Sequence, residues 1–236
     1  MKRFDELLAT LSEGYGDQAN WWPAEGAFEI MVGAILVQRT SWQNAARAIA
    51  TLRGSGLLNV TGLHDADTDD IESAVRTAGF FRMKSIRLRN LARLVIDHGG
   101  IERLAAMSTA ELRERLLAVK GIGAETADAM LLYAFRRPVV VVDEYLRRLE
   151  SRLHGRKVQL DDDDLRQRVL ADVGGAAALA ELHALVVTHG QQSCRKTPAC
   201  AGCCIADDCA LGRAGMRRRI DENGGISPGT SRSRAG

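Results

Sequence analysis

The sequence contains no long apolar run. None of its hydrophobic stretches approaches the roughly 20 residues that a transmembrane helix requires, so no membrane span is predicted. The first residues, Met1 to Asp5, become acidic at once and lack the apolar core of a signal peptide. We therefore expect a cytoplasmic protein without a membrane partner, in which structural disulfides are disfavoured.

Two enzyme signatures are also missing. The sequence has no nucleotide-binding glycine loop and no histidine-centred nucleophile, which argues against a small-molecule enzyme. The formal net charge is only +2, so total charge neither indicates nor excludes a nucleic-acid partner. The distribution of charge over the surface matters more.

Alternating runs of β-branched residues, which mark strands, are scarce as well. Ala, Leu, Arg and Glu recur throughout, and most of these residues favour helices. The run Val139–Val142 is β-branched, but it is too short and isolated to build a sheet. We therefore predict an all-α fold, and 236 residues allow one domain or two small ones.

Apolar periodicity predicts most of the helices. Ser108 and Glu111 have the spacing of a capping box, so one helix should begin there. The helices are expected at residues 4–15, 28–37, 43–53, 68–78, 82–98, 109–118 and 165–173. Residues 213–236 lack periodicity and are rich in Arg, Gly and Ser, so we expect a disordered basic tail.

Gly121 and Gly123 lie between two apolar segments and predict a helix–turn–helix hairpin. Glycines let such a turn approach a phosphate closely, and the first N–H groups of the second helix can bind the same anion. Lys120 and the pair Arg136-Arg137 add positive charge nearby. Many interhelical turns share this pattern, so the turn by itself fits a structural role equally well.

Asp143 directly follows the apolar run Val139–Val142. A carboxylate at the edge of a buried segment is costly unless it is hydrogen-bonded or used in chemistry. Asp143 could cap a helix over Leu146–Leu153, or it could act in catalysis. The two roles are compatible.

All five cysteines fall in one short segment near the C-terminus. Four have the spacing Cys194-x5-Cys200-x2-Cys203-x5-Cys209. Zinc sites more often have two C-x2-C pairs separated by a longer insert, whereas one short spacing between longer arms suits a [4Fe–4S] cluster. Cys204 is an additional thiol that could replace Cys200 as a ligand.

With the hairpin, Asp143 and the cysteines in view, the chain from about Phe28 to Cys209 resembles the endonuclease III superfamily of base excision repair DNA glycosylases. The family pattern Leu-x-x-Val/Ile-x-Gly-Ile/Val-Gly-x-x-Thr-Ala is matched by Leu116 to Ala127, and its catalytic Val-Asp by Val142-Asp143. The resemblance implies Asp143 as the catalytic residue and a [4Fe–4S] cluster on the four spaced cysteines, although the family's first cysteine arm is usually one residue longer. It also implies a nucleoid-associated monomer whose partner is double-stranded DNA with a damaged base.

The resemblance further implies two helical lobes with DNA bound across the cleft between them. One lobe would be a six-helix barrel over residues 25–135, ending in the hairpin. The other would combine residues 1–24 and 136–212 and hold the cluster.

Several residues would contact DNA by their place in the family pattern. Gln38 and Thr40 match a helix that carries Gln followed by Thr, and Gln38 would fill the gap left by the extruded base. The hairpin residues expected to contact DNA are Lys120, Gly121, Gly123 and Thr126.

Glu125 departs from the pattern of bifunctional members, which have a lysine at this position. That lysine forms a Schiff base with the sugar, and a carboxylate cannot form an imine. We therefore expect a monofunctional glycosylase in which AP-lyase activity is absent or weak.

The segment Trp21-Trp22-Pro23, with Trp42, resembles the base pocket of the 3-methyladenine glycosylase branch, and Glu125 would border the same pocket. An alkylated purine such as 3-methyladenine is cationic, and a tryptophan face attracts a cation by about 0.5–2 kcal/mol. Trp21 and Trp42 would then hold the flipped base between them. The adjacent tryptophans could instead fill the junction between the lobes.

Two other functions stay open on the sequence. The protein could be a glycosylase for mismatched or oxidised bases, with or without AP-lyase activity. It could also be a non-catalytic iron–sulfur DNA-binding protein, and an Asp143→Asn variant would separate that case from an enzyme.

Overall fold

The computed structural model of the protein describes residues 3–18, 21–155 and 160–214. Over these residues the regular secondary structure is helical and includes no strand, which confirms the all-α prediction. The helices are α1 (Phe4–Tyr15), α2 (Ala27–Leu36), α3 (Trp42–Gly54), α4 (Val60–Asp65), α5 (Thr68–Val75), η1 (Arg76–Ala78), α6 (Phe81–Asp97), α7 (Ile101–Ala106), α8 (Thr109–Ala118), α9 (Ala124–Ala129), η2 (Met130–Ala134), α10 (Glu144–His154), α11 (Asp162–Asp172) and α12 (Ala176–Gln192). Residues 215–236, nearly all of the predicted basic tail, lie outside the described residues.

The helices predicted from periodicity all form, and α1 and α8 have the predicted ends. Helix α8 begins at the predicted cap because the Ser108 hydroxyl accepts a hydrogen bond from the N–H of Glu111 at 3.2 Å. Helices α4 and α7 were not predicted, since their six residues are too few to show a period. No single helix of the described chain is long and apolar enough to cross a bilayer.

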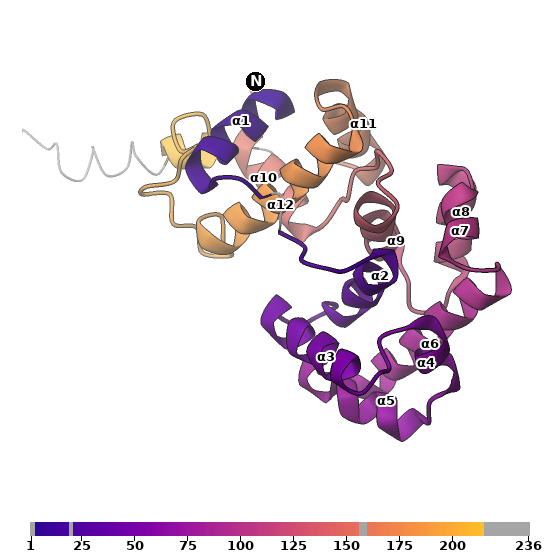
Figure 1. The fold of residues 1–236 in the computed structure, drawn as a ribbon. Helices are drawn as coiled ribbons and strands as arrows, with labels where there is room; N and C mark the ends of the chain where they lie inside the picture. Colours follow the sequence, from indigo (N-terminus) through magenta and orange to yellow (C-terminus); the bar gives the residue numbers. More distant parts are fainter. Residues whose placement is uncertain (1–2, 19–20, 156–159, 215–236) are drawn as a thin grey trace, which may run out of the picture.

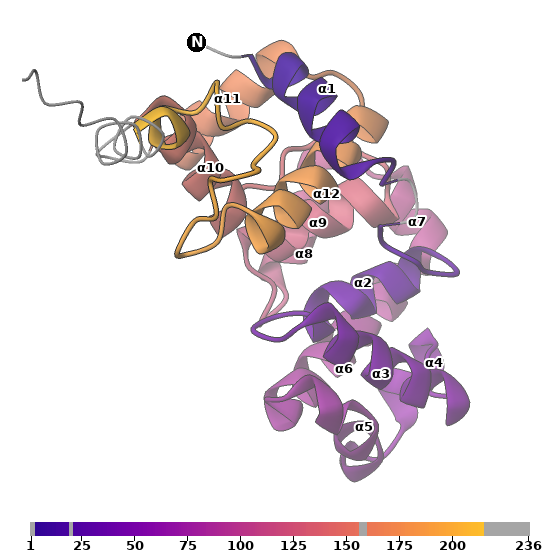
Figure 2. The same ribbon diagram turned by 90° about the vertical axis from the view of Figure 1, so that its left-hand side faces the viewer.

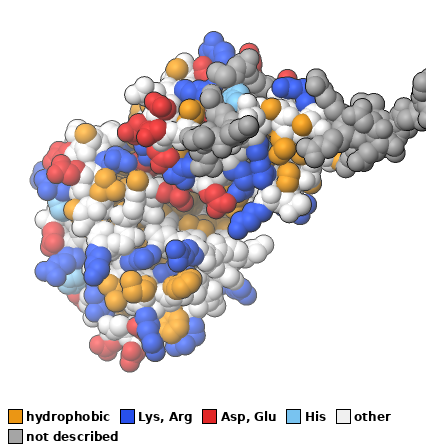
Figure 3. Space-filling view, turned by 180° about the vertical axis from the view of Figure 1, so that it is seen from behind, with side chains coloured by type: hydrophobic (Ala, Val, Ile, Leu, Met, Phe, Trp, Pro, Cys, Tyr) orange, Lys and Arg blue, Asp and Glu red, His pale blue; other side chains and the backbone are white. Residues whose placement is uncertain are grey.

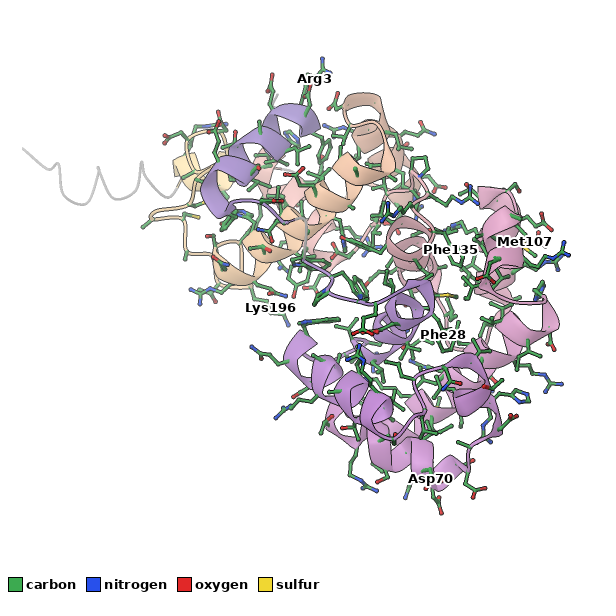
Figure 4. The ribbon with its side chains drawn as sticks, in the orientation of Figure 1. Arg3, Phe28, Asp70, Met107, Phe135 and Lys196 are labelled. Atoms are coloured by element: carbon green, nitrogen blue, oxygen red, sulfur yellow. The ribbon has the colours of Figure 1, made fainter. Side chains whose placement is uncertain are left out.

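The buried side chains form two clusters. The first cluster contains side chains from the helices α2 through α8 and from the hairpin. The second contains side chains from α1, from α10, α11 and α12, and from the cysteine segment. Figures 1 and 2 show the two groups of helices at opposite ends of the molecule, with α9 between them. Arg3, before α1, and Asp70, on α5, mark the two ends (Figure 4). The first helix of the chain therefore packs with the last ones.

Helix α9 and the π-helical turn η2 contribute to both clusters. Met130 and Leu131 belong to the first cluster, whereas Ala129 and Leu132 belong to the second. After η2 the run Val139–Val142 is extended and pairs with no strand in the described residues, and most of it is buried in the second cluster. This run leads directly to Asp143.

Asp128 adds a polar link between the two groups of helices. Its carboxylate is 2% exposed and accepts hydrogen bonds from Arg113 on α8 at 2.7 Å and from Arg166 on α11 at 3.1 Å. A buried carboxylate needs such partners to remain charged. The second hairpin helix is thereby tied to both its own hairpin partner and the opposite lobe.

Candidate functional site

The predicted hairpin forms between α8 and α9. Gly121 has φ +102°, and a Cβ on it would collide with the side chain of Arg87 on α6. Gly121 is therefore required both by its backbone conformation and by the close approach of α6. Gly123 and Lys120 are exposed, so this turn presents backbone and one cation to the surface.

Gln38 and Arg87 of α6 contact the hairpin and fix its position. Gln38 Nε2 donates to the carbonyl of Gly121 at 3.3 Å and to the hydroxyl of Thr126 at 3.0 Å. Arg87 donates to the Gln38 carbonyl oxygen, so both ends of this amide are engaged. Gln38 would have to break these hydrogen bonds to enter a duplex. Its role in filling the gap left by the extruded base therefore stays a prediction.

The residues beside Gln38 have separate partners. Arg39 is exposed in the left-handed region at φ +57°. The Thr40 hydroxyl accepts a hydrogen bond from Asn44 at 3.0 Å, at the start of α3. The buried Lys84 donates to the carbonyl of Leu36, at the end of α2, at 2.8 Å and thus supports the segment that carries Gln38.

The basic pair after the hairpin serves two purposes. Arg137 donates to the carbonyls of Ala105 at 2.6 Å and Met107 at 3.0 Å, so its charge is used to tie α7 to the chain. Arg136 is exposed, with φ +52°. Of this pair, Arg136 is the residue whose side chain faces solvent. On the face shown in Figure 3, Lys and Arg side chains lie on both lobes, on either side of the waist between them.

Asp143 caps α10, as one interpretation of the sequence predicted. The residue is 6% exposed, and Oδ1 accepts a hydrogen bond from the N–H of Leu146 at 2.7 Å. The second oxygen, Oδ2, lies 3.7 Å from Nε2 of His183 on α12. One oxygen of the carboxylate is thus committed to the fold, and the other faces a titratable side chain.

Titratable groups around Asp143 come from α9, η2, α10 and α12. Desolvation raises the pKa of the Glu125 carboxyl on α9, and the charge of Asp143 raises it further. Arg147 and His183 act on Glu125 in the opposite direction. Burial raises the pKa of the Tyr133 hydroxyl, and Asp143 adds to that effect. The predicted Glu125 and Asp143 therefore belong to one electrostatic site.

The tryptophans form one aromatic cluster beside this site. Trp22 contacts Trp21 at 5.9 Å between ring centres and Trp42 at 5.6 Å, each nearly edge to face, with interplanar angles of 71° and 66°. Trp22 packs over Gly33 of α2, where a Cβ would come within 3.2 Å of the indole nitrogen. Pro23 is exposed. The two outer rings thus stand roughly perpendicular to Trp22.

Tyr133 and His183 complete the cluster and were missed as functional residues. Tyr133 contacts Trp22 at 5.0 Å, and His183 contacts Trp21 at 5.5 Å. The sequence places them 50 residues apart on apolar helices. No local pattern signals their meeting, because it depends on how η2 packs against α12.

An exposed apolar ridge on α6 was also missed. Phe80 is 61% exposed at φ +48°, and Met83 and Ile86 follow it at helical spacing with 47% and 49% exposure. Arg87, one residue further, contacts Gly121 of the hairpin. The ridge therefore lies along the helix that supports the hairpin.

The cysteine segment forms a separate site. Its four predicted ligands line one hollow, whose cavity volume is about 20 Å³. Cys204 is exposed and is absent from the residues that line this hollow. The remaining wall is largely apolar and comes from Leu149, Pro198, Ala199, Ile205, Ala206 and Leu211.

The four cysteines around this hollow are a donor set of the kind that binds an iron–sulfur cluster. Among the described residues no three His, Cys, Asp or Glu side chains converge on a point where one metal ion could sit. Burial raises the pKa of the Cys203 thiol to about 11, and binding to iron would remove that proton.

The similarity to known proteins agrees with this geometry. Residues 32–173 match the family model of the HhH-GPD superfamily of base excision DNA repair proteins. A protein of Methanocaldococcus jannaschii described as a DNA repair glycosylase is 38% identical over 208 residues, which cover 86% of this chain and 94% of that protein.

Two solved structures share the fold. The 3-methyladenine DNA glycosylase of H. pylori, bound to 1,N6-ethenoadenine, superposes with a TM-score of 0.71 at 25% identity, over 81% of this chain and 98% of that one. A trapped endonuclease III–DNA covalent intermediate superposes with a TM-score of 0.76 at 17% identity, over 92% and 100% of the two chains.

Proposed function

The chain belongs to the HhH-GPD superfamily of base excision DNA repair proteins and is a DNA glycosylase, and we propose that it hydrolyses the N-glycosidic bond of alkylated purines such as 3-methyladenine without AP-lyase activity. One observation carries this proposal. Asp143, which is buried and caps α10, lies beside an aromatic cluster and opposite His183, and Glu125 occupies the position of a Schiff-base lysine.

The aromatic cluster supports a cationic base as the substrate. Trp22 contacts both Trp21 and Trp42, each nearly edge to face. A flipped purine stacked on Trp21 and Trp42 would place its positive charge against indole faces, which favour a cation over neutral adenine. The similar H. pylori structure is titled as a 3-methyladenine DNA glycosylase bound to 1,N6-ethenoadenine.

Asp143 would supply the catalytic charge. An alkylated base is already a good leaving group because of its charge, so strong acid catalysis is unnecessary. A fixed carboxylate stabilises the positive charge that develops on the sugar and orients the attacking water. The hydrogen bond from Leu146 N–H at 2.7 Å fixes that carboxylate before the substrate arrives.

Glu125 supports hydrolysis rather than lyase chemistry. A carboxylate cannot form the imine on which β-elimination depends. The groups that lower the pKa of Glu125 are the guanidinium of Arg147 and the imidazole of His183, and neither is an amine. Lys84 is buried against two backbone carbonyls, and Lys120 lies on the exposed side of the turn.

The DNA surface would combine the hairpin with α6. The exposed backbone at Gly123 and the charge of Lys120 suit a phosphate. The exposed ridge that begins at Phe80 suits contact with bases, since apolar side chains at such edges insert between base steps. The turn is part of the hairpin and the ridge lies beside it, so one monomer would use both to bind double-stranded DNA.

The cysteine hollow would hold a [4Fe–4S] cluster on Cys194, Cys200, Cys203 and Cys209. The cluster would supply cross-links that fix the loop, and no step of base release is assigned to it. Measuring iron, sulfide and zinc in the purified protein tests this assignment. Four irons with four sulfides support it, and one zinc per chain contradicts it.

Base release by Asp143→Asn tests the catalytic assignment. We expect the variant to bind duplex DNA with an abasic site as the wild type does, and to release 3-methyladenine from methylated DNA about a hundredfold more slowly. If Asp143→Asn is unfolded and does not bind DNA, the role of Asp143 is to cap α10 and the catalytic assignment fails. An unchanged rate would contradict the proposal.

A further inference from the structure

Tyr133, His183 and Asp143 form a line from η2 through α12 to the start of α10. The Tyr133 hydroxyl lies 2.7 Å from His183 Nδ1, and His183 Nε2 lies 3.7 Å from Asp143 Oδ2. The side chains of His183 and Asp143 are only 10% and 8% exposed. The two ring nitrogens of His183 thus face different partners.

The position of the protons follows from the Tyr133 hydroxyl. Burial and the charge of Asp143 raise its pKa, so Tyr133 keeps its single proton. The carbonyl of Ala180 at 3.1 Å and His183 Nδ1 at 2.7 Å compete for that proton. Asp143 Oδ2 can only accept, so a neutral imidazole beside it carries its proton on Nε2 and accepts from Tyr133 at Nδ1. In that arrangement the Ala180 carbonyl lies 3.1 Å from the hydroxyl oxygen without receiving its proton.

Among the residues that the structure describes, the groups around Asp143 leave His183 as the donor toward Oδ2. Glu125 and Glu144 are carboxylates, so each repels the Asp143 carboxylate and neither serves as its donor. Arg147 spends its guanidinium on Asp162, at 2.7 Å, and on the carbonyl of Val142, at 3.2 Å. The Leu146 N–H engages only Oδ1.

We propose, on the premise that Asp143 is the catalytic carboxylate, that His183 is a positioning residue that holds Asp143 Oδ2 through Nε2–H, and that Tyr133 fixes the tautomer required for this. The 3.7 Å separation is longer than a hydrogen bond. Such contacts tighten when a substrate closes the site. His183 also packs edge to face against Trp21 at 5.5 Å, so the base pocket and the carboxylate share one side chain.

Two variants of similar size separate positioning from packing. In His183→Gln the amide oxygen can accept from Tyr133, and the amide N–H₂ can donate to Asp143. In His183→Leu neither bond is possible. Under single-turnover conditions with methylated duplex DNA, we expect His183→Leu to release 3-methyladenine about tenfold to a hundredfold more slowly, and His183→Gln to recover most of the rate. Binding of duplex DNA with an abasic site should stay unchanged in both.

The tautomer has its own measurement, which does not depend on activity. The ¹⁵N chemical shifts of His183 in the full-length protein should show a neutral ring with the proton on Nε2, and Tyr133→Phe should weaken that preference. His98→Leu, at the end of α6 where Nδ1 bonds only the carbonyl of Leu94, is the matched histidine control and should release base at the wild-type rate.

The outcomes distinguish this inference from the proposed function. If Asp143→Asn keeps the wild-type rate, the catalytic assignment fails. If Asp143→Asn is inactive while His183→Leu releases base at the wild-type rate, only the positioning role fails. A His183→Gln variant as slow as His183→Leu, or a proton found on Nδ1, would also overturn it.

Discussion

Arg152 Nη1, on α10, donates to the Sγ of Cys194 at 3.3 Å. The same guanidinium also binds the carbonyl of Arg195 at 2.6 Å and that of Lys196 at 3.0 Å. In return, the Cys209 thiol donates to the carbonyl of Arg152 at 3.3 Å. One residue of α10 therefore orders both arms of the cysteine segment.

Arg152→Met should loosen this segment while leaving the lobes folded. Hydrogen bonds from a charged donor contribute about 1.5–3 kcal/mol each when they are part-buried, so we expect a lower melting temperature and faster loss of iron to a chelator. Iron release and thermal unfolding measure the two effects. Arg148→Met is a milder matched variant, because Arg148 reaches the carbonyl of Cys194 but donates to no cysteine sulfur in the described residues. Equal iron release by wild type and Arg152→Met would contradict the role of Arg152.

Lys84→Met tests how the buried charge of Lys84, beside the segment that carries Gln38, affects the stability of the fold. Burial lowers the pKa of Lys84 to about 8 from its ordinary 10.5, and Arg87 adds to the effect. Between these values the unfolded chain holds a proton that the native protein releases, so native stability rises with pH across that window. Below about pH 8 the cost of the buried charge is fully present. The neutral amine still has two N–H groups for the carbonyls of Leu36 and Ala78.

The measurement is urea unfolding of the wild type and Lys84→Met at pH 7 and pH 10. We expect the wild type to gain stability relative to Lys84→Met at the higher pH, because other titrating groups cancel in the difference. Lys120→Met, at an exposed lysine, should show no such change. A difference between wild type and Lys84→Met that is constant with pH would contradict the argument.

The ridge on α6 predicts a binding defect without a folding defect. Phe80→Ala removes a side chain that is 61% exposed, so the free energy of unfolding should barely change. If Phe80 stacks on bases, affinity for duplex DNA with an abasic site should fall about tenfold. Ile96→Ala, at the other end of the same helix and 42% exposed, is the control and should bind DNA like the wild type. Equal affinities for the two variants would remove Phe80 from the DNA surface.

Variants of the tryptophans distinguish a base pocket from residues that only fill the junction between the two groups of helices. Trp21→Ala and Trp42→Ala should lose release of 3-methyladenine and still fold, because Trp22 would keep its contact with Gly33. Trp22→Ala should be the variant that destabilises the fold, by about 3–5 kcal/mol if it behaves as a core aromatic residue. Circular dichroism and base release on the same samples decide the matter. Unfolding of Trp21→Ala would support the role of filling that junction.

Local signals made most of the fold predictable from the sequence. Apolar periodicity and the Ser108 cap fixed long helices such as α6 and α8, since both depend on residues within a few positions of each other. The family motifs around Leu116 and Asp143 predicted the superfamily, and the matching family model and relatives confirm it. Asp143 was found as a cap for the same reason, because its bond to Leu146 spans three residues.

Contacts between distant elements were not predictable. The pairing of Tyr133 with His183 and the capture of Gln38 by Gly121 join residues 50 and 83 positions apart. In the sequence Arg137 adds positive charge near the hairpin, yet in the structure it donates to two backbone carbonyls. The chemistry of a side chain depends on what the fold brings to it, and single-sequence patterns carry no record of that.

Release of free base, scored against strand breaks in the same reaction, tests the central claim most directly. Duplex DNA with methylated purines and duplex DNA with an oxidised pyrimidine would each be incubated with the protein, with and without alkali. The account predicts free 3-methyladenine and strand breaks only after alkali, because Glu125 cannot form an imine. Release of the oxidised pyrimidine with breaks before alkali would contradict the account, and so would release from neither substrate.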